Sequence, residues 1–124
     1  MNVEEVRDFA LSLPGVTEDQ VFGDDVVNFR IEGKIFLCLW LGHYGPGRPR
    51  MEEPRFALKL TPERNTTLRM EYGGVQPAYH WNKKHWSDVY YESGIADELL
   101  KDWMRESYLL VLGHLPKALR QKYQ

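Results

Sequence analysis

The stretch from Pro77 to Val89 gathers the chain's main local excess of side chains that could do chemistry. Its thirteen positions include two histidines, two lysines, an asparagine, a tyrosine and two tryptophans, and no acid precedes Asp88. Cations and amides contact phosphates, and exposed aromatic rings stack on bases. We therefore predict a nucleic-acid contact surface in this stretch, made of His80, Asn82, Lys83, Lys84 and His85.

The same stretch also has an architectural interpretation. Tyr79, Trp81 and Trp86 are large enough to close one edge of a sheet, which would leave Lys83 and Lys84 in a solvated turn. The motif would then belong to a protein-interaction or small-ligand-binding module that does not bind nucleic acid. Both interpretations stay open at this point.

Catalytic and metal chemistry are not predicted here. His80 and His85 do not fall on one helical face, and no cysteine or carboxylate joins them at a spacing known from metal sites. No serine or cysteine is arranged locally as a nucleophile, and the histidines lack an evident orienting partner. We accordingly expect a binding protein rather than an enzyme, without a metal or cofactor.

The segment from Gly42 to Arg50 is the least regular part of the chain, because glycine and proline interrupt it repeatedly. Its glycines do not form a phosphate-binding pattern, since no lysine–serine or lysine–threonine pair follows them. Arg48 and Arg50 are predicted outer phosphate contacts, although Glu52 and Glu53 offset their charge. We interpret the segment as a long hairpin tip between strands.

Composition limits the size and the partners. With 124 residues, the chain is expected to fold as a single domain, residues 1–124, with a core of its own. A net charge of −2 argues against a dedicated nucleic-acid binder, so any contact with DNA or RNA should be weak and salt-sensitive. Cys38 is the only cysteine and lies in an apolar run, so we expect a buried core residue.

The chain shows no sign of export or of membrane insertion. Its first residues lack the basic start and apolar run of a signal peptide. No apolar stretch approaches the roughly 20 residues that span a bilayer. We expect a soluble cytoplasmic protein with no membrane contact, and the sequence identifies no protein partner.

Hydrophobic periodicity predicts an α+β fold. Apolar side chains recur at helical spacing in residues 3–13 and 96–112, and Thr61–Pro62 begins a helix that runs to about residue 72. Strands are predicted over 16–22, 26–31, 34–41, 55–60 and 85–91, with a two-residue turn at Glu32–Gly33. This order predicts a mostly antiparallel sheet with the N-terminal helix and the C-terminal helices packed on one face.

The central motif resembles the signature of the MmcQ/YjbR family. It reads His80-x-Asn82-Lys83-Lys84-His85-Trp86-x-x-Val89, and Gly74-Val75-x-Pro77-Ala78-Tyr79 precedes it. The similarity covers nearly the whole chain, and it includes Leu13-Pro14-Gly15-Val16, Phe22-Gly23-Asp24-Asp25, Phe56-Ala57-Leu58-Lys59-Leu60-Thr61-Pro62-Glu63, Asp97-Glu98-Leu99-Leu100 and Ser107-Tyr108.

This resemblance implies a fold similar to that of frataxin (CyaY), described as a double-wing arrangement, which agrees with the α+β prediction. Members of the family are bacterial and are often labelled as DNA-binding on structural grounds, and such a label rests on analogy between folds. Frataxin's iron handling is not implied. The acidic ridge of its first helix is represented here only by Glu4, Glu5 and Asp8, with Arg7 among them.

Overall fold

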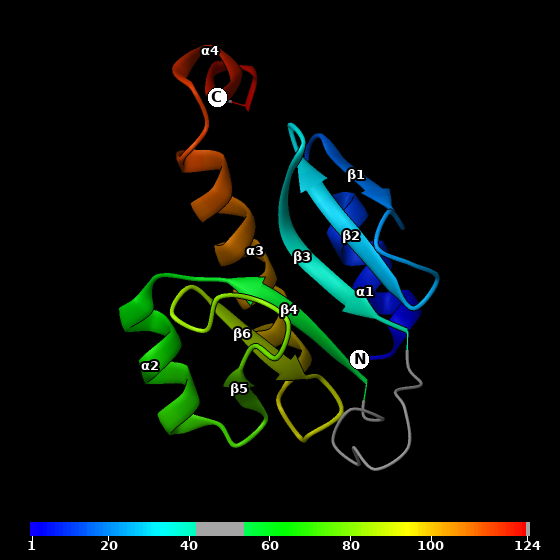
Figure 1. Cartoon of the computed structure of the whole chain (residues 1–124), viewed down its shortest axis with the longest axis vertical. Coiled ribbons are helices and arrows are strands. Elements are labelled where there is room, and N and C mark those ends of the chain that lie inside the picture. Colours follow the sequence, from blue (N-terminus) through cyan, green and yellow to red (C-terminus); the bar gives the residue numbers. More distant parts are fainter. Residues whose placement is uncertain (42–53, 124) are drawn as a thin grey trace.

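The computed structural model describes residues 1–41 and 54–123. These residues form a six-stranded antiparallel sheet in the order β1-β2-β3-β4-β6-β5, shown in Figure 1. The strands are β1 (Val16–Asp19), β2 (Val26–Ile31), β3 (Lys34–Trp40), β4 (Arg55–Lys59), β5 (Val75–Pro77) and β6 (Trp86–Tyr90). The helices are α1 (Val3–Ser12), α2 (Pro62–Glu71), α3 (Asp97–Gly113) and α4 (Lys117–Arg120), followed by a 3₁₀ turn, η2 (Gln121–Tyr123).

Helices α1 and α3 cover one face of the sheet, as the sequence predicts. In Figure 1 both lie behind the strands, and α3 contacts β2, β3 and β4 while α1 contacts β1 and β3. Apolar side chains between these layers are removed from water, which supplies the main driving force for folding. This core includes Val6, Phe29, Phe36, Leu39, Phe56, Leu58, Leu100, Trp103 and Met104.

Local signals in the sequence set several element boundaries. Asn2 and Glu5 form the capping box of α1, and Thr61 caps α2 ahead of Pro62. The predicted two-residue turn is confirmed, because Glu32 and Gly33 both have the positive φ that a type I′ turn needs.

Two sequence predictions are tested further in this fold, and one strand appears that was not predicted. The first strand ends at Asp19 rather than Phe22, because the Asp19 side chain accepts a hydrogen bond from the Val21 amide and starts a turn. Strand β5 was not predicted, since it has only three residues and contains proline, which is tolerated at a sheet edge. Cys38 is fully buried, as expected. The predicted hairpin tip, with Arg48 and Arg50, lies outside the described residues.

The β2–β3 turn gives a first testable prediction. Gly33 has a φ of 80° and open space where a Cβ would stand, so Gly33→Ala should cost only backbone strain, about 1 kcal/mol of unfolding free energy. Gly73 also has open space but no left-handed φ, so Gly73→Ala is the matched control and should not destabilise. Urea denaturation of both variants measures the difference, and equal midpoints would contradict the turn assignment.

Candidate functional site

The loop from Ala78 to His85 lies against the face of the sheet that α1 and α3 leave uncovered. In Figure 1 it passes in front of the strands, while the two helices lie behind them. Ala78 and Trp86 are buried there in a second apolar cluster with Val26, Cys38 and Ala57. Trp81 stacks on Trp86 with ring centroids 4.6 Å apart. This loop therefore covers the face of the sheet that the helices leave free, which we call the open face.

Asn65 of α2 holds the end of this loop. Its side chain is fully buried, and its Nδ2 donates to the carbonyl oxygens of Leu60 and Lys84 at 3.2 and 3.1 Å. Its Oδ1 accepts a hydrogen bond from the Ser87 hydroxyl at 2.7 Å. A buried amide with all these partners fixes the loop to the helix and leaves little freedom at its C-terminal end.

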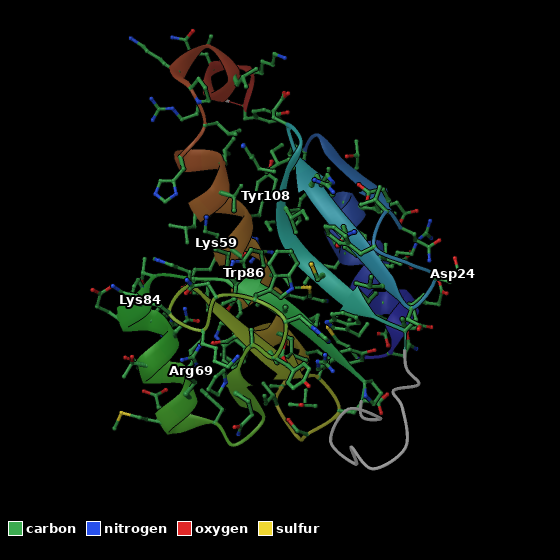
Figure 2. All side chains as sticks on the ribbon, viewed as in Figure 1. Asp24, Lys59, Arg69, Lys84, Trp86 and Tyr108 are labelled. Atoms are coloured by element: carbon green, nitrogen blue, oxygen red, sulfur yellow. The ribbon has the colours of Figure 1, made fainter. Side chains whose placement is uncertain are left out.

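Arg69 lies one helical turn after Asn65 and binds the same loop. Its Nη2 donates to the carbonyl oxygens of Lys83 and Trp86 at 2.6 and 2.7 Å, and its Nε donates to the Ser87 hydroxyl. Burial lowers the pKa of this guanidinium, and the Asp88 charge acts in the opposite direction. Figure 2 shows Arg69 on α2 and Lys84 beside the first turns of the same helix. The sequence prediction missed both Asn65 and Arg69, although their spacing of four residues places them on one helix face.

Asn82 shapes the turn from inside the loop. Its Oδ1 accepts the Lys84 amide at 2.9 Å, and its carbonyl oxygen accepts the amides of His85 and Trp86. These bonds help to define the conformation of the turn.

The other predicted contact residues of this loop differ in their surroundings. Lys83 and Lys84 are exposed, and the Lys83 ammonium lies 3.5 Å from the Tyr79 carbonyl oxygen. His85 is half-buried, and the exposed His80 packs its ring against Trp40 at a centroid distance of 4.9 Å. The contact role of all these residues stays a prediction.

A pocket of about 510 Å³ opens between this loop and the strands. We call it the aromatic pocket, and its lining residues are Phe22, Val26, Asn28, Trp40, His80 and Trp81. They come from the turn after β1, from β2 and β3, and from the loop before β6. Among the described residues of the predicted contact surface, His80 alone lines it.

Two of the aromatic rings meet at the mouth of the pocket. Phe22 is 62% exposed and meets Trp81 edge-on, with centroids 6.3 Å apart. Sequence reasoning assigned Phe22 to a strand, but the turn that ends β1 carries it to the pocket.

Polar side chains are also buried on this face of the sheet, and one of them, Asn28, lines the pocket. Asn28 donates to Asp19 and accepts a hydrogen bond from the Cys38 thiol at 3.2 Å. Burial raises the pKa of that thiol, which therefore stays protonated near neutral pH. Arg55 and Asp88 form a buried ion pair at 3.3 Å. The sequence signal for Asn28 and Asp88 was a polar residue inside a strand, whereas Arg55 begins its strand.

Two further findings concern the described part of the chain. No group of three or more histidine, cysteine, aspartate or glutamate residues is placed there to hold a metal ion. None of the helices in residues 1–41 and 54–123 combines the length and apolar character required to cross a membrane.

The fold and the site define an α+β protein with one sheet face covered by helices and the other covered by an aromatic loop. The chain belongs to the YjbR family, because the YjbR family model matches residues 11–110. This confirms the resemblance drawn from the central motif.

Known relatives agree with this assignment. The chain is 35% identical over 114 residues to the uncharacterised protein YbdF of Escherichia coli O157:H7, covering 92% of this chain and 87% of YbdF. It is 26% identical over 122 residues to the uncharacterised protein YjbR of Escherichia coli K12, covering 98% and 96% of the two chains.

Two solved structures share the fold. The crystal structure of the Deinococcus radiodurans protein DR2400, which has a DUF419 domain, matches with a TM-score of 0.83 and 29% identity. That match covers 98% of this chain and 86% of DR2400. A Pseudomonas syringae crystal structure matches with a TM-score of 0.73 and 26% identity, covering 89% and 98% of the two chains.

The α2 contacts give a second prediction. Arg69→Ala should lower the unfolding free energy by about 2 kcal/mol, because two loop carbonyls lose a charged donor. Met70→Ala is the neighbouring control, since Met70 is 82% exposed and should change stability by less than about 0.5 kcal/mol. Hydrogen exchange should also speed up for the amides of His85 and Trp86 in the Arg69 variant alone. Unchanged exchange there would show that the loop does not depend on Arg69.

Proposed function

We propose that this protein binds a small ligand that carries a flat aromatic ring, and that the ring enters the aromatic pocket. The observation that carries the proposal is the lining of that pocket, in which four of the six residues have aromatic rings: Phe22, Trp40, His80 and Trp81. Aromatic side chains attract other rings by offset stacking and edge-to-face contact, in addition to the gain from apolar burial.

The size of the pocket supports a small molecule. Its volume of about 510 Å³ lies within the roughly 300–1,000 Å³ that is typical of small-molecule sites. Asn28 adds a polar group to the lining, and such sites usually combine apolar walls with a few polar groups.

Charge favours an uncharged or anionic ring over a cation. Aromatic pockets also hold cations such as quaternary ammonium groups. Here the Arg55 guanidinium already lies over the Trp40 ring, 4.9 Å from its centroid. A cationic ligand on the same ring would meet this like charge at short range, in competition with the ion pair that Arg55 forms with Asp88.

The proposal is for binding without a chemical step on the ligand. The thiol of Cys38 lies on the same face of the sheet, and it is fully buried and hydrogen-bonded to Asn28. Its raised pKa keeps it in the unreactive thiol form.

Phe22 gives the sharpest test of this proposal. Because its ring is exposed at the pocket mouth, Phe22→Ser should leave the fold intact and weaken binding of a fused-ring probe such as benzimidazole by about two- to tenfold. Val21→Ser is the matched control, since Val21 is adjacent and 67% exposed but does not line the pocket. Titration by NMR gives both affinities. Equal weakening in the two variants, or no binding of any flat-ring probe to the unmodified protein, would contradict the proposal.

Nucleic-acid binding is a second candidate function. It is favoured by the exposure of Lys83 and Lys84, whose ammonium groups form no ion pair with the described residues. Tyr79, from the same loop, is 45% exposed. Two cations and one exposed ring would give weak binding that falls quickly with salt.

Fluorescence anisotropy with labelled single-stranded DNA, duplex DNA and RNA tests this candidate. The Lys83→Ala/Lys84→Ala variant should bind more weakly, and its affinity should depend less steeply on salt, because two phosphate contacts are lost. Lys101→Ala provides a control for the loss of a cation elsewhere, on α3. Absence of binding by the unmodified protein at low salt would remove nucleic acid as a ligand.

A further inference from the structure

Trp40 is in contact with two other groups on the open face of the sheet. The guanidinium of Arg55 lies over its ring, and the ring of His80 packs against it at 4.9 Å. Trp40 comes from β3, Arg55 from β4 and His80 from the loop before β6. The orientation of this pocket wall therefore depends on three separate parts of the chain.

Asp88 connects Arg55 to the loop. Its carboxylate lies 3.3 Å from the Arg55 Nε, and its Oδ2 accepts a hydrogen bond from the Tyr79 backbone amide at 3.1 Å. Tyr79 is the residue before His80, and the two rings meet edge-on at 4.6 Å. These contacts form a closed chain. It runs from Trp40 through Arg55, Asp88 and Tyr79 to His80, whose ring packs against Trp40 again.

We infer that the buried Arg55–Asp88 ion pair is a positioning device that holds both sides of the aromatic pocket in one relative orientation. The inference rests on the proposed function only for the claim that ligand affinity depends on the pair. Neither residue lines the pocket, so each acts through the rings that it positions. Burying an ion pair costs desolvation free energy, which is recovered only if the two charges are well placed and hydrogen-bonded. Here the pair occupies positions on the sheet face that apolar side chains could fill.

The charge of Asp88 can be removed by lowering the pH, because its carboxylate can take up a proton. The charged groups that act on it are Arg55 of β4, Lys83 of the loop and Arg69 of α2. Burial raises the pKa of Asp88, and these three cations together with the Tyr79 amide oppose the rise. The carboxyl therefore takes up its proton, as pH falls, above the ordinary aspartate value of 3.8. Protonation removes the charge of Asp88 from its pair with Arg55, and both pocket walls should respond together.

The test uses the full chain with 5-fluorotryptophan at its four tryptophans and follows the ¹⁹F signals as pH falls. The signals of Trp40 and Trp81 should change with one shared midpoint above pH 3.8, while that of Trp103, in the core on the other face, stays constant. A constant Trp103 signal also shows that the protein remains folded. A response of Trp40 without Trp81, or of neither, would overturn the inference.

Two variants test whether Asp88 is the group whose protonation changes the Trp40 and Trp81 signals. Asp88→Asn keeps an acceptor for the Tyr79 amide but removes the Asp88 charge beside the buried Arg55 guanidinium, so it risks unfolding. The double variant Arg55→Gln/Asp88→Asn removes both buried charges together and keeps the experiment decisive. The shared change of the Trp40 and Trp81 signals should vanish in either variant. A shared step that survives both substitutions would exclude Asp88 as its source.

Benzimidazole binding separates this inference from the proposed function. The double variant should bind benzimidazole at least fivefold more weakly than the unmodified protein. Equal affinity would overturn the positioning role and leave the proposed pocket in place. If the unmodified protein does not bind benzimidazole or any other flat ring, yet the two tryptophan signals titrate together, the proposed function fails and the coupling of the two walls stands.

Discussion

The open face of the sheet depends on the hydrogen bonds that α2 makes to the loop before β6. Helices α1 and α3 bury one face of the sheet, and the opposite face also carries apolar side chains. Asn65 and Arg69 of α2 bind backbone carbonyls at the end of this loop and so hold it over that second face. Once the loop is fixed there, its aromatic rings meet those of β3 and of the turn after β1, and the aromatic pocket results.

Much of the fold follows from short-range signals that a sequence displays directly. Asn2 with Glu5 and Thr61 with Pro62 are helix starts because their side chains and backbone act within one turn. The Glu32–Gly33 turn is set by local backbone conformation, and the apolar spacing of α3 selects its buried face. Strand β5 was missed because three edge residues carry too little pattern, and pairing with β6 alone defines them.

The site was harder to predict because its members interact across the chain rather than along it. The motif drew attention to charged residues, yet its turn is built by Asn82 and by the distant Arg69. Arg55 and Asp88 stand in different strands, so their pairing appears only when β4 and β6 are neighbours. A charged residue within a strand, such as Asp88, needs a partner if it is buried, but the sequence alone does not show which residue that partner is.

The most direct test of the proposed pocket is a ¹H–¹⁵N NMR titration of the protein with flat aromatic fragments, observed at the indole N–H groups. The account predicts that an uncharged fused ring such as benzimidazole shifts the Trp40 and Trp81 signals to saturation and leaves Trp103 unchanged, because Trp103 lies in the core on the other face. If no fragment shifts Trp40 and Trp81, or if Trp103 shifts equally, the pocket does not bind aromatic ligands and the account is wrong.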